Sequence, residues 1–348
     1  MPVSKAVVPS ILEPDPARVL ERIQGLPGDL GLVEIRGDRM SAGDLADAVA
    51  RSDRDVVVTI RREGEGGFFR GTEDQRIRCL QAGLQAGAAY VDLDVKAAAA
   101  VDRRFRRDRL VLSWHGDGTD LRELQEVLSR MRSIGAACFK LVPRADRLSD
   151  LAAIRDFLAG PEDDGTPVAC FASGRHGPLS RLLALSWGSC WTFGFPCGGE
   201  NTAAGQFTIS ELTEIYGVTS LDAATQIFGL VGSRLAGSPS PAMHNAALRD
   251  LGMNARYLPM EIDRFQDLAA LADPAGPVGA AGFGVTMPFK EEAAALAVEL
   301  DPDGAAAGAV NTLIPTPGGW KGFNTDASAM RQRIRPALQE SGCRALVY

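Results

Sequence analysis

The sequence predicts an α/β protein in which a (β/α)8 TIM barrel is followed by a smaller α/β domain. Two observations favour the barrel. Eight short runs of β-forming residues alternate with amphipathic, helix-like segments up to about residue 215. No G-x-G-x-x-G turn follows the first run, whereas the alternative of a doubly wound open sheet would require one. The third observation is the length of 348 residues, which is enough for about two domains.

The expected barrel strands are runs rich in β-branched and other apolar residues, at 6–11, 32–36, 56–61, 90–95, 110–115, 137–142, 168–172 and 190–195. Segments 72–87 and 120–134 are amphipathic and rich in Ala, Leu and Arg, so we expect helices there. We expect the last barrel helix at 208–212 and a linker at 216–226.

A strand at 227–232 is expected to open the second domain. Ser240 followed by Pro241 is typical of a helix start, with Ser240 as the capping residue. Hydroxyls and free N–H groups at such a start form a small carboxylate-binding site, although a plainly capped helix explains the pattern equally well.

The composition is typical of a globular protein, with 45% hydrophobic and 23% charged residues. A net charge of -7 argues against nucleic acid or an anionic membrane as partner. No apolar run of 18 residues occurs and no signal-peptide core is found near the start, so we expect a cytoplasmic protein. The six cysteines form no C-x-x-C pair, which indicates reduced thiols and no zinc site: Cys79, Cys138, Cys170, Cys190, Cys197 and Cys343.

Lys140 stands in the middle of the apolar run 137–143. Lysine is rarely buried without a reason, and burial disfavours its charged form. A neutral amine can then attack a carbonyl group. The alternative is a strand-end lysine whose stem is buried while its ammonium group reaches water.

The other reactive residue types also fall at the expected carboxyl ends of strands, where barrel enzymes carry their active sites. They are Glu34, Arg36, Asp38, Arg61, Glu65, His115, Arg181, Thr202 and Gln206. An imine on a lysine acidifies the neighbouring C–H, and a histidine can take that proton and pass it to a leaving hydroxyl. Arginines clamp a carboxylate, and Glu65 is suited to fix the tautomer of His115. The set therefore suits dehydration of a β-hydroxy ketone that bears a carboxylate.

The first part of the chain, residues 1–218, resembles type I 3-dehydroquinate dehydratase, a Schiff-base barrel enzyme of the shikimate pathway. The matching pieces are Glu34-Ile35-Arg36-Gly37-Asp38, Arg61 with Glu65, His115, Lys140, Ser180-Arg181, Thr192-Phe193-Gly194 and Thr202-Ala203-Ala204-Gly205-Gln206. The resemblance implies that Lys140 forms the imine, that His115 is the acid and base, and that Glu65 orients it. It assigns substrate binding to Glu34, Arg36, Arg61, Arg181, Thr202 and Gln206, and it implies neither metal nor cofactor.

This sequence departs from that family at four pocket positions. Trp114 and Gly116 flank the histidine, where the family often has a small or amide residue before it and Asp or Asn after it. Phe171 and Ser173 replace methionines common on strand seven. These changes affect the expected shape of the pocket more than its chemistry.

Residues 227–340 resemble the substrate-binding domain of shikimate dehydrogenase. Four motifs occur in the order and spacing of that family, at 235–245, 282–290, 308–312 and 322–326. The resemblance implies that Lys290 and Asp326 are a catalytic proton-transfer pair. It implies further that Ser238 and Ser240 hold the shikimate carboxylate, while Thr286 and Asn311 bind its hydroxyls. Gly237 and Gly284 depart from the histidine and asparagine usual at those positions.

Residues 341–348 are expected to begin a Rossmann domain that is missing from this chain, and that domain would bind the NADP of the dehydrogenase. We therefore expect a fused enzyme of aromatic amino acid biosynthesis whose second half binds shikimate weakly and does not oxidise it. The alternatives are a class I Schiff-base aldolase and a degenerate barrel kept for ligand binding. The expected partners are 3-dehydroquinate, 3-dehydroshikimate and shikimate, and a homodimer is left open.

Overall fold

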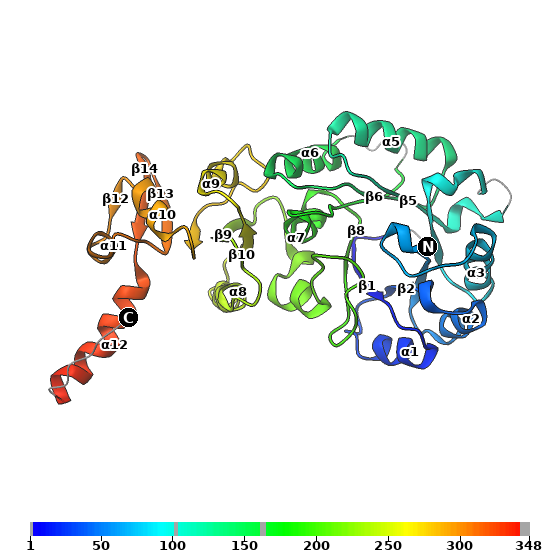
Figure 1. Cartoon of the computed structure of the whole chain (residues 1–348), viewed down its shortest axis with the longest axis horizontal. Coiled ribbons are helices and arrows are strands. Elements are labelled where there is room, and N and C mark those ends of the chain that lie inside the picture. Colours follow the sequence, from blue (N-terminus) through cyan, green and yellow to red (C-terminus); the bar gives the residue numbers. More distant parts are fainter. Residues whose placement is uncertain (1–2, 101–103, 161–164, 342–348) are drawn as a thin grey trace. The chain divides into compact units, whose positions relative to one another are not determined.

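The computed structural model describes residues 3–100, 104–160 and 165–341, with the side chains of the last helix described as far as residue 334. The chain divides into two compact units, residues 1–223 and 224–348. The division falls inside the linker expected at 216–226. Each unit has its own sheet and its own apolar core, and each is described by itself (Figure 1).

The first unit is a ring of eight parallel strands, in the order β7-β6-β5-β4-β3-β2-β1-β8. Their bounds are β1 Ala6–Ile11, β2 Leu32–Arg36, β3 Asp55–Thr59, β4 Tyr90–Asp94, β5 Leu110–His115, β6 Cys138–Val142, β7 Val168–Cys170 and β8 Trp191–Gly194. Between β7 and β8 the Cys190 amide donates a hydrogen bond to the Val168 carbonyl, at 2.9 Å. The predicted barrel is confirmed, and three of its strands have the expected bounds.

Helices follow most of the strands and cover the outside of the ring, as Figure 1 shows. They are α1 Pro16–Gln24, α2 Ala42–Arg51, α3 Glu73–Gln85, α5 Leu121–Ile134, α6 Leu148–Leu158 and α7 Gly177–Trp187. Short 3-10 turns lie at Gly37–Arg39, Glu63–Glu65, Val95–Ala100, Arg107–Arg109 and Val218–Ser220. Capping sets where the helices begin: Thr72 and Gln75 form a capping box at α3, and Asp120 accepts from two backbone amides of α5.

The last barrel helix begins where the sequence predicted it but differs in type and length. Thr208 and Glu211 exchange hydrogen bonds in the manner of a helix cap, which is the signal that the sequence carries. Ile209 and Ser210 are α-helical, and the chain continues as a π-helical turn at Glu211–Ile215, which ends before Gly217 in the left-handed region at φ 57°. The helix expected at 208–212 is therefore present in part, is mostly π-helical and extends three residues further.

Side chains inside the barrel form two layers. The lower layer is apolar and includes Val8, Val57, Val111, Cys138 and Trp191. Because side chains on a strand alternate between its two faces, the residue two positions further along points to the same interior. These upper residues are Ser10, Thr59, Ser113, Lys140 and Phe193. The polar layer thus rests on a packed apolar floor, at the carboxyl ends of the strands.

The second unit is a mixed sheet in the order β10-β9-β11-β13-β14-β12. Its strands are β9 Gln226–Gly232, β10 Ala255–Glu261, β11 Phe283–Val285, β12 Glu299–Leu300, β13 Thr312–Thr316 and β14 Gly319–Phe323. Its helices are α8 Ser240–Asp250, α9 Leu268–Ala272, α10 Lys290–Leu296, α11 Pro302–Ala307 and α12 Thr325–Ser341, with a 3-10 turn at Phe265–Asp267. The expected Rossmann strand at 341–348 lies outside the described residues, apart from Ser341, which ends α12.

The start of α8 corrects one detail of the prediction. Ser240 is the first helical residue and Pro239 is the capping residue, so the Ser240 side chain does not cap the helix. The Ser238 hydroxyl instead accepts from the Ser240 amide, at 3.4 Å.

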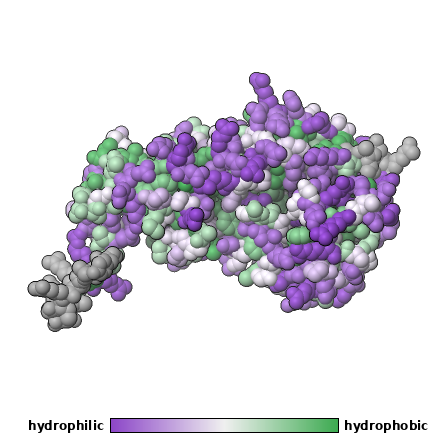
Figure 2. Space-filling view, in the orientation of Figure 1, coloured by the Kyte–Doolittle hydropathy of each residue, from purple (hydrophilic) through white to green (hydrophobic). Residues whose placement is uncertain are grey.

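The surfaces of the two units differ in their apolar content. Figure 2 shows mainly hydrophilic residues over the visible face of the barrel unit. Among the described residues, Phe68 is the one large apolar side chain that the barrel exposes, whereas the second unit exposes eight: Met243, Leu251, Met253, Met287, Leu296, Val298, Ile314 and Met330. Within the described ranges no helix is long and apolar enough to cross a bilayer.

Candidate active site

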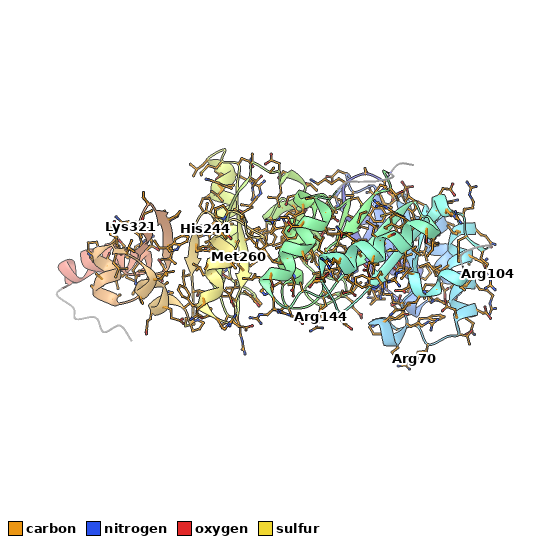
Figure 3. The ribbon with its side chains drawn as sticks, turned by 90° about the horizontal axis from the view of Figure 1, so that it is seen from above. Arg70, Arg104, Arg144, His244, Met260 and Lys321 are labelled. Carbon is orange, nitrogen blue, oxygen red and sulfur yellow. The ribbon has the colours of Figure 1, made fainter. Side chains whose placement is uncertain are left out.

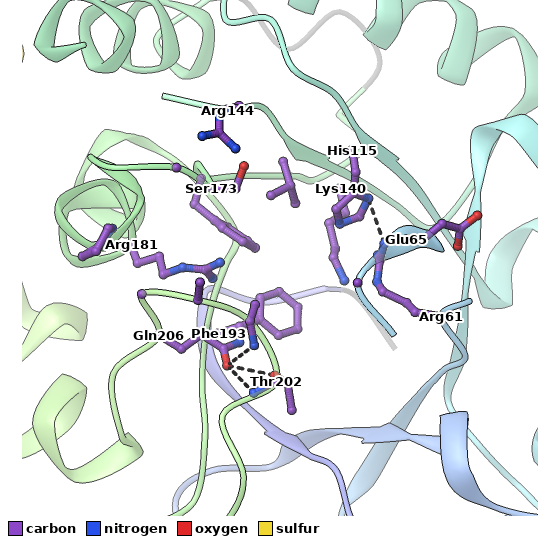
Figure 4. A pocket seen from close by; sticks show the side chains of 18 of the residues that line it. Arg61, Glu65, His115, Lys140, Arg144, Ser173, Arg181, Phe193, Thr202 and Gln206 are labelled. Atoms are coloured by element: carbon purple, nitrogen blue, oxygen red, sulfur yellow. Dashed lines mark hydrogen bonds between the residues drawn. The ribbon is translucent and has the colours of Figure 1, made fainter. Parts of the chain in front are cut away.

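A cavity of about 740 Å³ opens at the carboxyl ends of the barrel strands (Figure 4). All nine barrel residues to which the sequence assigned a role line it: Glu34, Arg36, Arg61, Glu65, His115, Lys140, Arg181, Thr202 and Gln206. Arg144 and Ser173, which were not predicted as site residues, also reach its wall. The barrel therefore brings together side chains that are as far as 172 residues apart in the sequence (Glu34 to Gln206).

Lys140 is buried, but it is not isolated. Its Nζ lies 2.6 Å from Asp92 Oδ2 and 3.4 Å from Glu34 Oε1, and 4.6 Å above the centre of the Phe193 ring. Lys140 therefore forms a buried ion pair with two carboxylates. The sequence singled out the burial of this lysine but did not predict its pairing with Asp92.

The two carboxylates are held by further donors. Asp92 accepts from the Ser113 hydroxyl at 2.5 Å, while Glu34 accepts from Ser10 and, at 2.7 Å, from Thr59. Burial is the largest single influence and pushes the pKa of each carboxyl group upward, but the positive charge of Lys140 outweighs it together with Arg61 and hydrogen bonds at Asp92, and together with Arg36 and the Ser10 hydrogen bond at Glu34. Both pKa values end below the ordinary range, so both groups are charged at neutral pH.

His115 ends β5, and its Nδ1 lies 3.1 Å from Arg61 Nη1 and 4.0 Å from Asp94 Oδ2. Burial lowers the pKa of the imidazole well below its usual value, and the positive charges of Arg61 and Lys140 lower it further. The ring is therefore neutral at pH 7. Since a guanidinium can only donate, Nδ1 accepts from Arg61 and the ring proton sits on Nε2.

Glu65 does not take the position expected for it. It lies exposed at the cavity mouth, and no hydrogen bond joins it to His115 among the described residues. Arg61 and Asp94 stand beside Nδ1 instead. Burial raises the pKa of Asp94, and the negative charge of Asp92 adds to that rise.

Arg36 is committed to protein contacts, with Nη2 2.6 Å from Asp38 Oδ2 and Nη1 3.2 Å from the Thr202 carbonyl. Asp38 also accepts from the backbone amides of Arg61 and Phe68, at 3.0 and 3.2 Å. One buried carboxylate thus ties the loops after β2 and β3 together, and through Arg36 it reaches the loop after β8.

Gln206 organises that last loop, as the dashed lines in Figure 4 show. Its Oε1 accepts from the Thr202 amide at 3.1 Å, from the Thr202 hydroxyl at 2.8 Å and from the Ala203 amide at 3.2 Å. Thr202 and Gln206 are therefore joined to each other within one loop that lines the cavity.

Arg181 supplies a buried cation with spare donors. It is 3% exposed, projects from α7, and stacks over the Phe171 ring at 4.5 Å. Its Nε and Nη1 have no hydrogen-bond partner within the described part of the chain. Burial lowers the pKa of Arg181 to about 10, which still leaves it charged at pH 7. A fork of unpaired donors facing a cavity is suited to a carboxylate. Phe171, one of the departures from the family pattern, supports this cation.

Two departures flanking His115 are spatially linked. A Cβ atom added to Gly116 would lie 1.9 Å from Cζ2 of Trp114, which is far inside contact distance. The indole therefore occupies the space that a side chain at position 116 would need. The two changes from the family pattern form one compensated pair.

The second unit brings the predicted Lys290–Asp326 pair together and joins the predicted Asn311 to Thr325, which was not predicted. Lys290 Nζ, at the start of α10, lies 2.7 Å from Asp326 Oδ2, in the first turn of α12. Asn311 Nδ2 donates to the Thr325 hydroxyl at 2.8 Å, and Thr325 N donates back to Asn311 Oδ1 at 3.1 Å. Thr286 directly follows β11, and Ser238 and Ser240 lie at the start of α8. The structure gives no contact that joins these serines to the Lys290–Asp326 pair within the described ranges.

The departure at Gly284 also has a spatial partner. A Cβ atom on Gly284 would lie 2.0 Å from Oη of Tyr257, whose ring stacks on His244 at 4.2 Å. His244, labelled in Figure 3, is anchored in turn by Nδ1 at 2.9 Å from the Ser240 carbonyl. Burial raises the pKa of Tyr257 to about 12. A phenol therefore fills the space of the missing side chain.

Neither a metal ion nor a dinucleotide has a site among the described residues. No group of three His, Cys, Asp or Glu side chains in the described ranges is arranged to hold a metal. No G-x-G-x-x-G turn joins a strand to a helix within these ranges, so the residues present do not fit the pyrophosphate of NADP.

Comparison with known proteins agrees with this geometry. The profile of the type I 3-dehydroquinase family matches residues 8–222, and that of the shikimate dehydrogenase substrate-binding domain matches residues 230–313. The chain belongs to the type I 3-dehydroquinase family. Its second unit is of the shikimate dehydrogenase substrate-binding type, as the resemblance implied.

Relatives of three kinds are found. The bifunctional 3-dehydroquinate dehydratase/shikimate dehydrogenase of Arabidopsis thaliana, a chloroplastic protein, is 28% identical over 89% of this chain and 53% of its own length. The 3-dehydroquinate dehydratase of Desulfotalea psychrophila is 30% identical over 61% of this chain and 97% of its own. An NADP-dependent shikimate dehydrogenase of Anaeromyxobacter dehalogenans is 45% identical over 35% of this chain and 44% of its own. This chain thus spans about half of the bifunctional relative.

Solved structures support the fold. Dehydroquinate dehydratase and shikimate dehydrogenase from S. pombe AroM aligns with a TM-score of 0.54 and 22% identity, over 97% of this chain and 67% of that one. The 3-dehydroquinate dehydratase of Geobacillus kaustophilus aligns with a TM-score of 0.55 and 22% identity, over 62% of this chain and 90% of that one.

Sequence reasoning missed several members of this dehydroquinase site. Asp92 and Asp94 alternate along β4, which is otherwise apolar and buried, and that alternation was a readable signal of two carboxylates at the same rim. Ser10 and Thr59 carried no comparable signal, because a hydroxyl in a buried strand is commonplace. Their importance appears only from their contacts with Glu34.

Proposed function

We propose that the barrel dehydrates 3-dehydroquinate to 3-dehydroshikimate through an imine on Lys140. The observation that carries the proposal is a buried lysine held by two carboxylates in a cavity that also receives the unpaired guanidinium of Arg181. The substrate is a β-hydroxy ketone with a carboxylate, so one end matches the lysine and the other the arginine. Figure 4 shows Lys140 and Arg181 entering the cavity from different sides.

The first stage forms the imine. The Lys140 ammonium passes one proton to Asp92, its nearest carboxylate, and the resulting amine attacks the ketone carbon. The carbonyl oxygen takes one proton from the attacking nitrogen and one back from Asp92 and leaves as water, and the nitrogen becomes a protonated imine. The positive nitrogen draws electrons from the neighbouring carbon and makes its C–H acidic.

The second stage is elimination. His115 removes that proton, and the C–H electron pair forms an enamine. The enamine pair then expels the β-hydroxyl, which takes the proton back from His115 and leaves as water. Hydrolysis of the conjugated imine releases the enone and restores Lys140. In the free site Arg61 donates to Nδ1 of His115, so the ring proton is on Nε2. When the substrate binds, Arg61 moves away and the ring proton moves to Nδ1, where a carboxylate, Asp94 or Glu65, accepts a hydrogen bond from it. This leaves Nε2 free to act as the base.

The remaining residues recognise the substrate. Arg181 binds the carboxylate bidentately. Thr202 and Gln206 close over it, and Glu34, Arg36 and Arg61 contact the hydroxyl-bearing edge. These are the roles implied by the resemblance, supported by the position of each residue on the cavity wall.

Incubation of the chain with 3-dehydroquinate, followed by ultraviolet absorbance of the conjugated product, tests the proposal. Borohydride added during turnover reduces the imine, and mass spectrometry locates the adduct. We expect product and an adduct on Lys140, both absent in Lys140→Met and both kept in Lys96→Met, a change at an exposed lysine. Carbon–carbon cleavage products would favour an aldolase instead. The absence of both product and adduct would favour the alternative of a barrel that only binds a ligand.

We propose further that the second unit binds shikimate, with Lys290 and Asp326 poised to exchange the hydroxyl proton. Oxidation of shikimate needs NADP, which is named for the dehydrogenase relatives. The described residues of this chain do not form a binding site for it. Titration of shikimate against the chain and its Lys290→Ala variant tests binding. We propose that the ligands of both units are small molecules and that the protein is cytoplasmic. The proposal leaves open whether it forms a homodimer.

A further inference from the structure

Ser10 occupies a central position that the proposed mechanism leaves without a role. It lies on β1, is fully buried, and stands in the polar layer two residues beyond Val8. The parallel pairing of β1 and β2 sets Ser10 directly beside Glu34. The Ser10 hydroxyl donates to Glu34 Oε2, and its oxygen lies 2.9 Å from the Thr202 hydroxyl, within reach of that hydroxyl's proton. One side chain therefore joins the loop after β8 to the carboxylate beside Lys140.

Glu34 receives a second hydroxyl that lacks this connection. Thr59 donates to Oε1 at 2.7 Å, and Lys140 approaches the same oxygen at 3.4 Å. Within the described chain Thr59 makes no side-chain hydrogen bond to the loop at 202–206. Ser10 and Thr59 thus both donate to Glu34, but only Ser10 also contacts the loop at 202–206. Thr59 is therefore a matched control.

Thr202 has one hydroxyl proton and two acceptors within reach. Ser10 Oγ lies at 2.9 Å and Gln206 Oε1 at 2.8 Å. Donation to one acceptor excludes donation to the other. A ligand hydroxyl that donates to Gln206 Oε1 competes with Thr202 for that oxygen and turns the Thr202 proton toward Ser10.

We propose that Ser10 is a positioning residue that couples the substrate-binding loop at 202–206 to Glu34 and, through it, to Lys140. Hydrogen bonds in a chain polarise one another, so a proton received from Thr202 strengthens the bond that Ser10 donates to Glu34. A ligand that binds the loop thereby changes the strength of the Ser10–Glu34 hydrogen bond, and so the position and charge distribution of the carboxylate beside Lys140. The inference rests on the dehydration proposed above.

A double-mutant cycle on the full chain tests the coupling. The variants are Ser10→Ala, Thr202→Val and both together, with the matched set Thr59→Val, Thr202→Val and both together. The readouts are kcat and KM for 3-dehydroquinate, with circular dichroism and thermal unfolding to confirm that each variant folds. Ser10→Thr is the conservative variant that keeps the hydroxyl.

We expect Ser10→Ala and Thr202→Val each to reduce kcat/KM roughly tenfold, the size of one lost bond to a charged group. Together they should cost little more than either alone, because each breaks the same chain. The Thr59→Val and Thr202→Val losses should instead multiply, to roughly a hundredfold. Ser10→Thr should recover most of the Ser10→Ala loss, and the deficit should lie largely in kcat.

Independent, multiplying losses in the Ser10 cycle would overturn the coupling while leaving the dehydratase intact. The coupling is equally overturned if Ser10→Ala changes thermal stability alone and leaves kcat and KM as in the parent. A parent chain that folds but makes no product would instead overturn the proposed function, and the coupling with it. Parent turnover therefore separates the two failures.

Discussion

Asp92 is the nearest partner of Lys140. The two side chains form a buried ion pair at 2.6 Å, and the proposed attack on the ketone requires that pair to be broken. In the proposed mechanism Asp92 is also the nearest group that can take the departing proton. The proposal therefore gives this residue a part both in stability and in the first chemical step.

We expect Asp92→Asn to lower the free energy of unfolding by about 3–5 kcal/mol, the usual cost of breaking a buried ion pair. It should also reduce kcat, since the amide cannot accept the ammonium proton. Urea unfolding and steady-state kinetics measure the two effects. Asp47→Asn breaks the exposed pair with Arg51 and should change stability by about 0.5 kcal/mol or less. Equal effects of the two variants would contradict the role given to Asp92.

The pKa of His115 gives a pH dependence with a definite sign. Burial, together with Arg61 and Lys140, lowers the folded-state pKa well below 6.5, whereas the unfolded histidine takes up its proton near pH 6.5. The unfolded state therefore binds more protons as the pH falls through this range, and the folded state loses stability. Glu34 and Asp92, whose folded pKa values are lowered, affect stability only at more acidic pH.

We therefore expect the free energy of unfolding of the parent to fall between pH 7 and pH 5, and we expect His115→Gln to flatten that decline. Chemical unfolding at half-unit pH steps measures it. A parent curve that is flat over this window, or an unchanged slope in the variant, would show that the histidine is not held neutral.

The individual site residues differ in how far they could be predicted. Lys140 and His115 were recognisable because barrel strands present their carboxyl ends to one rim, so strand position alone places them. Arg181 was recognisable because it follows the seventh strand, and it lies in α7. The partner of His115 was not, because a hydrogen bond depends on the path of the glycine-rich loop. That loop is tied down by Asp38 through the Phe68 amide, and it leaves Glu65 exposed.

Among the loops, the one that follows β8 depends on a single amide. Gln206 Oε1 holds three donors from Thr202 and Ala203, so the loop keeps its shape only while that oxygen is present. Asn201, on the same loop, caps the Ala203 amide at 3.0 Å from an exposed position. The two residues offer a natural comparison.

We expect Gln206→Ala to raise the KM for 3-dehydroquinate roughly tenfold, because one to two hydrogen bonds of the closed loop are lost. Asn201→Ala should leave KM within about twofold, since its bond lies in solvent. Steady-state kinetics on both variants provide the comparison. A similar KM for both would show that loop closure does not depend on Gln206.

The strands were the most predictable elements and the chain around 208–220 the least. Short apolar runs bounded by breakers marked the buried strands, and three of the eight have the expected ends. The Thr208–Glu211 cap signal is local, whereas the π-helical turn that follows is set by packing of Leu212 and Tyr216 in the barrel unit. A cap predicts that a helical turn begins, and it does not determine which kind.

At the scale of the whole molecule, the two units have separate cores and separate predicted chemistries. Their motif order was readable from the sequence, because each motif set is local to one unit. The division between residues 223 and 224 depends on the packing of each unit and could only be bracketed by composition.

Separate cores predict separate unfolding. Leu258 on β10 is fully buried in the second unit, and Leu112 on β5 is fully buried in the barrel. Each change to alanine should cost about 2–5 kcal/mol in its own unit. We expect calorimetry to show two transitions, with Leu258→Ala lowering one and Leu112→Ala the other, and with dehydratase kinetics unchanged in Leu258→Ala. A single transition shifted by both variants would mean that the units unfold together.

The contacts of Gly116 with Trp114 and of Gly284 with Tyr257 have a consequence for the evolution of this sequence. A side chain at position 116 would meet the Trp114 indole, and one at position 284 would meet the Tyr257 hydroxyl, so either substitution requires the aromatic partner to shift. A lineage that shrinks the aromatic partner first avoids that shift, whereas the reverse order passes through a clash. At these two positions the order of the two changes therefore matters, and a library should vary each glycine together with its aromatic partner.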